Sequence, residues 1–185
     1  MKKIKFAIIG NPISHSLSPT MHNYWFDKYN IKAEYELLNT EESEIQNVIN
    51  KIKDKEIKGI NVTLPYKKTV IPFLSKIIND AKETHSVNTI ILDDHGNLIG
   101  ENTDVFGFQA AYLKSIPRQE KKSKKVLILG AGGVAPSIIY ALLKSNISDI
   151  SLTNRTHERS LFIKKNFKGI NIINWNDFSK YLYKF

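Results

Sequence analysis

The sequence contains no cysteine, which excludes disulfides, thiolate metal sites and a cysteine nucleophile. It has no apolar run that could span a membrane, and the run at 6–10 is too short for the hydrophobic region of a signal peptide. Internal repeats and low-complexity tracts are also absent. These absences predict a cytoplasmic protein without a membrane partner.

The 185 residues, 42% of them hydrophobic, are sufficient for one large domain or two small ones. Residues 1–104 hold 13 Lys/Arg and 14 Asp/Glu, a net charge of −1, whereas residues 105–185 hold 14 and 4, a net charge of +10. A basic second half suits an anionic cofactor. The densest basic run, 121–125, has no interleaved aromatic residues, so it favours a solvated linker over a nucleic-acid partner.

A glycine-rich turn stands between an apolar run and a helical pattern. Val126–Leu129 indicates a strand buried on both faces, and Pro136 opens the helical pattern that follows. The residues between them have the G-x-G-x-x-A pattern: Gly130, Ala131, Gly132, Gly133, Val134 and Ala135. Gly130 allows the tight turn, Gly132 lets a pyrophosphate approach the backbone, and Ala135 permits close helix packing. This context indicates a dinucleotide site.

The end of the next expected strand, 149–153, predicts which dinucleotide binds. An NAD site would offer Asp or Glu there to the ribose 2′-hydroxyl, whereas this sequence has Asn154-Arg155-Thr156, with Arg159 one helical turn on. A guanidinium can pair with a 2′-phosphate, which a carboxylate would repel. The alternative is that both arginines are solvated residues at a helix start. Because glycine turn, spacing and charge agree, we predict NADP as the cofactor.

Strands and helices also alternate in the first half. Strands are expected at 4–10, 35–38, 59–62, 87–92 and 98–100, with a hairpin-like turn at 93–97. Helices are expected from Ser18 or Pro19, through 45–52, over 66–74 and over 106–113. The first of these helices has its apolar spacing at Met21, Tyr24, Trp25 and Tyr29.

Polar residues gather where the expected strands end, which is where open α/β sheets bind ligands. Ser14 and Ser16 could hold an anion, although Ser-Pro-rich loops commonly satisfy their own backbone. Alternation places Asn61 and Thr63 on one face of the third strand, with Lys67 on the helix just beyond. A lysine at a helix start opposes the helix dipole. The alternative for Lys67 is an ordinary surface lysine.

Asn88 and Asp104 add an amide and a carboxylate at further strand ends. Five motifs then follow one another over residues 6–159: Ser-His-Ser-Leu-Ser-Pro, Asn-Val-Thr-x-Pro-x-Lys, Val-Asn-Thr, Asn-Thr-Asp, and Gly-Ala-Gly-Gly with Asn-Arg-Thr. In this order they resemble the shikimate dehydrogenase family, which reduces 3-dehydroshikimate with NADPH in aromatic amino-acid biosynthesis. The resemblance favours a functional Lys67 over a surface lysine.

The resemblance implies a role for each motif. Ser14 and Ser16 would hold the substrate carboxylate, and the ring hydroxyls would be bound by Asn61, Thr63, Asn88 and Asp104. Lys67 and Asp104 would form the catalytic pair, because an ammonium can supply the proton that the developing alkoxide needs. The pyrophosphate would lie on Gly130 to Ala135. Selection of NADP would fall to Asn154, Arg155, Thr156 and Arg159.

The implied fold is α/β, with an open mixed-sheet substrate domain at 1–104 and an incomplete Rossmann NADP-binding domain at 105–185. Residues 116–124 would be a linker. After the glycine turn we expect three strands, the last at 170–173, which make one βαβαβ unit for the adenine end of a dinucleotide. The unit for the nicotinamide and the C-terminal segment that returns to the substrate domain in the family would be missing. The chain therefore resembles a C-terminally truncated member.

Three hypotheses remain open at this point. The first is an NADP-dependent shikimate dehydrogenase acting on shikimate and 3-dehydroshikimate. The second is a non-catalytic module that binds substrate and nucleotide, and the third is a quinate/shikimate dehydrogenase. No metal is expected, and the oligomeric state is open, with a homodimer as one alternative. Val105 departs from the glycine that many family members have after Asn-Thr-Asp.

Overall fold

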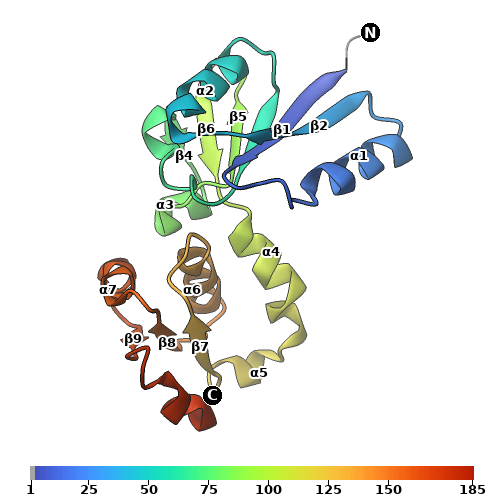
Figure 1. The fold of residues 1–185 in the computed structure, drawn as a ribbon. Helices are drawn as coiled ribbons and strands as arrows, with labels where there is room; N and C mark the ends of the chain where they lie inside the picture. Colours follow the sequence, from blue (N-terminus) through green and yellow to red (C-terminus); the bar gives the residue numbers. More distant parts are fainter. Residues whose placement is uncertain (1–2) are drawn as a thin grey trace. The chain divides into compact units, whose positions relative to one another are not determined.

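The computed structural model describes residues 3–185, which form two compact units (Figure 1). The first unit runs through Asn102, and the second covers Thr103–Phe185. Each unit has its own hydrophobic core. Over residues 3–185, every helix is too short or too polar to cross a membrane.

The first unit is built on a mixed sheet that has six strands in its described residues. They are β1 (Ile4–Gly10), β2 (Ala33–Asn39), β3 (Gly59–Val62), β4 (Lys76–Ile77), β5 (Thr89–Leu92) and β6 (Leu98–Glu101), in the order β2-β1-β3-β5-β6-β4. β1 is parallel to β2 and β3, whereas β5 is antiparallel to β3 and β6. The mixed α/β sheet predicted for this half is confirmed, although the sequence pattern does not predict β4.

The two faces of this sheet pack against different helices, because successive strand residues point to opposite sides. Ile9 of β1 belongs to the core cluster that includes α2 (Ile45–Lys53). That helix buries four residues at helical spacing: Ile45, Val48, Ile49 and Ile52. Ile8 belongs to a second cluster on the other face, to which α1 (Ser18–Lys28) contributes Phe26. Asn61, the polar residue of β3, lies on this second face beside Ile8.

The helix α1 begins at Ser18, as predicted, but the apolar spacing noted in its sequence does not mark the side that packs on the sheet. Three of its residues are 43%, 60% and 44% exposed: Met21, Tyr24 and Trp25. The side that meets the sheet carries His22 and Phe26, whose rings contact Tyr35 and Phe6. Aromatic residues occur on both sides of this helix, so apolar spacing alone selects the wrong one.

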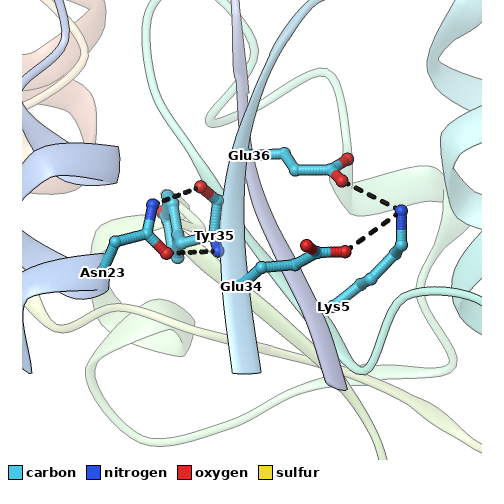
Figure 2. Close-up of polar contacts among 5 residues, drawn as sticks. All are labelled: Lys5, Asn23, Glu34, Tyr35 and Glu36. Carbon is cyan, nitrogen blue, oxygen red and sulfur yellow. Dashed lines mark hydrogen bonds and ion pairs between the residues drawn. The ribbon is translucent and has the colours of Figure 1, made fainter. Parts of the chain in front are cut away.

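The edge strand β2 is held by side chains from α1 and β1 (Figure 2). The Tyr35 N–H donates to Asn23 Oδ1 (2.9 Å), and Asn23 Nδ2 donates to the Tyr35 carbonyl (3.0 Å). Lys5 pairs with Glu34 (3.2 Å) and Glu36 (2.9 Å). Because these charges are solvent-accessible, the ion pairs contribute little stability. Asn23, in contrast, gives the edge strand a partner for both backbone groups of one residue.

The predicted helix at 66–74 is wrong. The chain forms successive turns there, followed by the short 3-10 helix η2 (Ile71–Phe73). Pro72 lacks a backbone N–H and disfavours the α conformation of Ile71, so an α-helix cannot continue through this segment. This unit also contains two short helices that the sequence pattern does not predict. They are the 3-10 helix η1 (Glu42–Glu44) and the α-helix α3 (Asp80–Thr84).

The second unit contains a parallel three-stranded sheet, counted over its described residues, in the order β7-β8-β9. Its elements are α4 (Asp104–Ala111), η3 (Leu113–Ser115), α5 (Arg118–Lys121), β7 (Lys125–Leu129), α6 (Ala135–Lys144), β8 (Asp149–Thr153), α7 (His157–Asn166), β9 (Asn171–Ile172) and η4 (Phe178–Lys184). The predicted βαβαβ succession is confirmed. The short helix α5 lies inside the segment 116–124, which the sequence predicts to be a linker.

The strand β7 is not buried on both faces, contrary to the prediction. It is an edge strand of partly exposed residues, and Leu129 at its end is 58% exposed. The fully buried strand is β8, in which Ile150 through Thr153 are all buried. A short apolar run identifies a strand, but only the order β7-β8-β9 decides which strand lies in the middle.

Candidate functional site

Four strand ends of the first unit meet at one edge of its sheet. Three backbone hydrogen bonds define that edge: Thr63 N–H to the Ile9 carbonyl (2.9 Å), Val62 N–H to the Asn88 carbonyl (2.8 Å), and Asn88 N–H to the Glu101 carbonyl (3.0 Å). The ends of β1, β3 and β6 and the start of β5 are therefore neighbours. The segments that leave these ends carry the predicted substrate residues of this unit.

A glycine at the end of β1 brings the serine loop close to the end of β3. A Cβ at Gly10 would lie 2.7 Å from Thr63 Cγ2 and 2.9 Å from the Leu64 carbonyl oxygen, which is too close for any real side chain. The Asn11 N–H donates to the same Leu64 carbonyl (3.1 Å). Glycine is needed at position 10 because two backbone segments approach each other there.

The two predicted carboxylate-binding serines lie in the loop after Gly10. Ser14 is exposed and Ser16 is partly buried, while Ile13 anchors the loop in the core at 1% exposure. Ser16 Oγ accepts a hydrogen bond from the Ser18 N–H (3.3 Å) at the start of α1. A hydroxyl that accepts in this way still has its own proton to donate to a carboxylate.

Asn61 is engaged in three hydrogen bonds within the sheet. Its Oδ1 accepts from the Tyr35 hydroxyl (2.7 Å), and its Nδ2 donates to the Asn88 carbonyl (3.1 Å) and to Thr89 Oγ1 (3.1 Å). Burial raises the pKa of Tyr35, so the phenol stays protonated and acts as the donor. Asn61 therefore joins β2, β3 and β5 in addition to any contact with a ligand.

Sequence reasoning misses Tyr35 and Thr89 as members of this polar group. Tyr35 stands 26 positions from Asn61, and no local pattern reveals that two such strands flank β1. Thr89 had a usable signal, because it follows Asn88 directly in the Val-Asn-Thr motif. Thr63 is partly exposed and Asn88 is buried at the same sheet edge.

Lys67 lies on a turn and not at a helix start, so the predicted conflict between its charge and a helix dipole is wrong. Its carbonyl accepts a hydrogen bond from the Val87 N–H (2.8 Å), and its neighbour Tyr66 is buried with the hydroxyl donating to the Thr40 carbonyl (2.7 Å). These contacts fix the backbone of a partly exposed lysine near the sheet edge. Partial burial lowers the pKa of the adjacent Lys68.

Asp104 is the first residue of α4 and belongs to the second unit. A carboxylate in the first turn interacts favourably with the N-terminal end of a helix. Val105, the next residue, is fully buried in the core of that unit, which accounts for a branched apolar side chain at this position. Because Lys67 and Asp104 belong to different units, their pairing stays a prediction.

The glycine turn of the second unit joins β7 to α6 and has room for a ligand beside its backbone. Gly130 has φ of +111°, a conformation that favours glycine. A Cβ added at Gly132 would meet no atom of the described chain within 4 Å. Packing within the protein therefore does not require glycine at 132, whereas a phosphate lying close to the backbone would. Pro136 lies in the first turn of α6, as predicted.

Asn154 connects the end of β8 to this turn. Its Oδ1 accepts from the Ala131 N–H (3.1 Å), and its Nδ2 donates to the Thr156 carbonyl (2.8 Å). Arg155 and Arg159 are exposed at the start of α7, where their guanidinium groups are accessible to an anion. The residues present thus fit a dinucleotide phosphate. In the part of the chain that the structure describes, no cluster of His, Asp and Glu could hold a metal ion.

A glycine turn within a parallel βαβ unit is typical of the class of dinucleotide-binding α/β proteins, and the polar strand ends of the first unit add a second candidate ligand site. Sequence profiles narrow this class. Residues 8–90 match the profile described as the shikimate dehydrogenase substrate binding domain, and residues 113–185 match that of shikimate / quinate 5-dehydrogenase.

Individual relatives agree with these profiles. The chain is 49% identical over 177 residues to the shikimate dehydrogenase (NADP(+)) of Pelagibacter ubique, a match that covers 96% of this chain and 65% of that protein. The chain belongs to the shikimate dehydrogenase family.

Solved structures give the same result. The crystal structure of shikimate dehydrogenase from Aquifex aeolicus matches with a TM-score of 0.84 and 34% identity, over 93% of this chain and 63% of that one. The Thermus thermophilus enzyme in complex with NADP(H) and shikimate matches with a TM-score of 0.78 and 30% identity, over 92% and 62%. This chain therefore spans less than two thirds of the length of each of these proteins.

Proposed function

We propose that this chain provides the substrate and cofactor sites of an NADP-dependent shikimate dehydrogenase, which catalyses the reversible reduction of 3-dehydroshikimate to shikimate. The observation that carries the proposal is the convergence of β1, β3, β5 and β6 at one sheet edge, where Ser14, Ser16 and Thr63 follow strand ends and Asn88 directly precedes β5. The same family of proteins includes a relative named for shikimate and NADP(+). The assignment of domains 1–104 and 105–185 to substrate and cofactor is part of this proposal.

The proposed cofactor is NADP, held by the second unit. Gly130 to Ala135 would receive the pyrophosphate at the N-terminus of α6, which attracts negative charge. Asn154, Arg155, Thr156 and Arg159 would select the 2′-phosphate, with the two guanidinium groups as its charge partners. The reduced cofactor, when bound, supplies a hydride to the substrate carbonyl.

The substrate would be a carboxylate with several ring hydroxyls. Ser14 and Ser16 would donate hydroxyl protons to its carboxylate, and Asn61, Thr63, Asn88 and Asp104 would bind the ring hydroxyls. Lys67 as an ammonium would polarise the carbonyl and donate a proton to the oxygen as negative charge develops there. Asp104 would hold that ammonium in place and accept from a neighbouring hydroxyl.

The test is reduction of NADP⁺ by shikimate, with NAD⁺ and quinate as alternative reactants. We expect turnover with shikimate and NADP⁺ that is lost in Lys67→Ala. The second profile describes a shikimate / quinate 5-dehydrogenase. Faster turnover with quinate would therefore favour a quinate/shikimate dehydrogenase. Absence of shikimate binding by calorimetry would overturn the proposal.

A second candidate is a chain that binds shikimate and NADP without turnover. The observation behind it is that the match covers 65% of the Pelagibacter ubique relative and 63% of the Aquifex aeolicus structure. Binding of both ligands by calorimetry, together with no NADP⁺ reduction, would favour this candidate. A cytoplasmic location and a homodimer remain predictions from the sequence.

A further inference from the structure

A directional series of side-chain hydrogen bonds crosses the sheet of the first unit from β2 to the start of β5. The Tyr35 hydroxyl donates to Asn61 Oδ1 (2.7 Å), Asn61 Nδ2 donates to Thr89 Oγ1 (3.1 Å), and Thr89 Oγ1 donates to Asn88 Oδ1 (3.0 Å). Two of the four residues, Asn61 and Asn88, are proposed substrate-binding residues. The other two, Tyr35 and Thr89, have no assigned role.

The direction of the series begins with the phenol. A tyrosine hydroxyl has one proton, and the raised pKa of Tyr35 keeps that proton in place. The Asn88 carbonyl can only accept, so Asn61 turns its NH₂ group to that carbonyl and its oxygen to the Tyr35 hydroxyl. Both protons of that NH₂ group are in use, one on the Asn88 carbonyl (3.1 Å) and one on Thr89. Asn61 can offer a ligand only the second lone pair of Oδ1, which is an acceptor.

The same logic fixes the amide of Asn88. Thr89 Oγ1 accepts from Asn61 and directs its single proton to Asn88 Oδ1. The oxygen of the Asn88 amide is thus turned to Thr89, and its NH₂ group faces away from Thr89 as a donor. The two hydroxyls thus help to hold Asn61 Oδ1 and the Asn88 amide in the orientations that a ligand meets.

Tyr35 is itself held from the side of α1. Asn23 binds both its backbone N–H and its carbonyl (Figure 2), and the imidazole of His22 stacks on its ring with centroids 4.3 Å apart and planes 11° apart. Its own residual exposure is 5%. Because the backbone and the ring of Tyr35 are already fixed, this residue loses little rotamer entropy when a ligand binds.

We propose that Tyr35 and Thr89 are positioning residues of the site for the ring hydroxyls, in which Tyr35 holds Asn61 in place as an acceptor and Thr89 holds Asn88 in place as a donor. This inference rests on the proposed function and extends it to specificity. The hydroxyl that meets Asn61 must donate its proton, and the hydroxyl that meets Asn88 receives one. A ligand with hydrogen in place of the first hydroxyl leaves Asn61 without that partner and binds more weakly.

The experiment measures dissociation constants by calorimetry with the full chain. Shikimate and its three mono-deoxy analogues are titrated into the unaltered chain, Tyr35→Phe, Thr89→Val and Thr89→Ser. Thr40→Val is the matched control, because it also loses one buried hydroxyl bonded to an oxygen, the Leu38 carbonyl at 2.9 Å in the same unit. NADP⁺ is titrated into every variant as a check on the second unit.

We expect Tyr35→Phe and Thr89→Val to bind shikimate about tenfold more weakly, while Thr89→Ser and Thr40→Val bind as the unaltered chain does. The loss in Tyr35→Phe should disappear for one deoxy analogue, the one that lacks the hydroxyl facing Asn61, and persist for the others. A merely structural role would weaken all four ligands equally.

Three outcomes would contradict the inference. Equal shikimate affinity of the unaltered chain and both hydroxyl-deletion variants overturns the positioning role and leaves the proposed function intact. An equal loss for every analogue also overturns it, because the effect is then general. No binding of shikimate by the unaltered chain overturns the proposed function and this inference together. If Tyr35→Phe does not fold, Thr89→Val and Thr89→Ser decide by the same criteria.

Discussion

Lys67 is held near the sheet edge by its backbone, through the hydrogen bond from Val87 and the buried neighbour Tyr66. Its side chain can therefore be removed without disturbing a helix. We expect Lys67→Ala to lower kcat by about 10²- to 10⁴-fold and to change the KM for shikimate by less than about fivefold, because a proton donor acts in the transition state. Steady-state kinetics with Lys68→Ala as the control checks this. A change mainly in KM would remove Lys67 from the chemical step.

The buried hydroxyl group of Thr153 is expected to lower the stability of the fold. This residue is fully buried at the end of β8, and its Oγ1 has no hydrogen-bond partner among the residues that the structure describes. Thr84, equally buried, donates from Oγ1 to the Asp80 carbonyl (2.8 Å). We expect Thr153→Val to raise the free energy of unfolding by about 1 kcal/mol and Thr84→Val to lower it by about 1 kcal/mol or more. Denaturant titration measures both, and a destabilised Thr153→Val would indicate an unseen partner.

At the scale of elements, the turn between β7 and α6 contains one glycine that the fold requires and one that only a bound ligand would require. Gly130 requires glycine for its positive φ, whereas a Cβ at Gly132 meets only open space. We expect Gly132→Ala to change stability by less than about 0.5 kcal/mol and to weaken NADP⁺ binding at least about tenfold. Gly130→Ala should cost about 1–3 kcal/mol of stability. Unchanged NADP⁺ affinity in Gly132→Ala would remove the turn from the cofactor site.

The start of α7 is expected to decide which dinucleotide binds. We predict that Arg155→Ala with Arg159→Ala weakens NADPH by about 10- to 100-fold and NADH by less than about twofold, because only NADPH carries the 2′-phosphate. The double variant Lys164→Ala with Lys165→Ala removes the same charge from exposed positions at the other end of the helix. Fluorescence titration of both cofactors gives the comparison. Equal losses of NADPH and NADH in the arginine variant would contradict a 2′-phosphate site.

At the scale of the whole molecule, two cores predict two separately stabilised parts. Each unit holds one of the two tryptophans, Trp25 in the first and Trp175 in the second. We expect shikimate to stabilise the unfolding transition reported by Trp25, and NADP⁺ the one reported by Trp175, by about 2.7 kcal/mol at a hundredfold excess over Kd. Variants Trp175→Phe and Trp25→Phe isolate the two signals. A single transition that responds to both ligands alike would contradict the proposal that shikimate binds mainly to the first unit and NADP⁺ to the second.

The sequence by itself determined most of the regular elements and the family. The runs that form β1, β3 and β8 and the glycine turn before α6 follow from patterns within a few residues, because propensity and periodicity are local properties. The same is true of the five motifs, which are short and occur in a given order. The reason why the predicted helix at 66–74 is wrong is also visible in the sequence, since Pro72 lies inside that segment.

Only the tertiary structure decided which faces and edges these elements present. It left β7 at an edge, turned His22 and Phe26 of α1 toward the sheet in place of Trp25, and joined Tyr35 to Asn61 across 26 positions. These outcomes depend on strand order and on partners that are distant in the sequence. A pattern within one segment contains no information about which other segment will lie beside it, and that neighbour determines burial, hydrogen bonding and the direction of each donor.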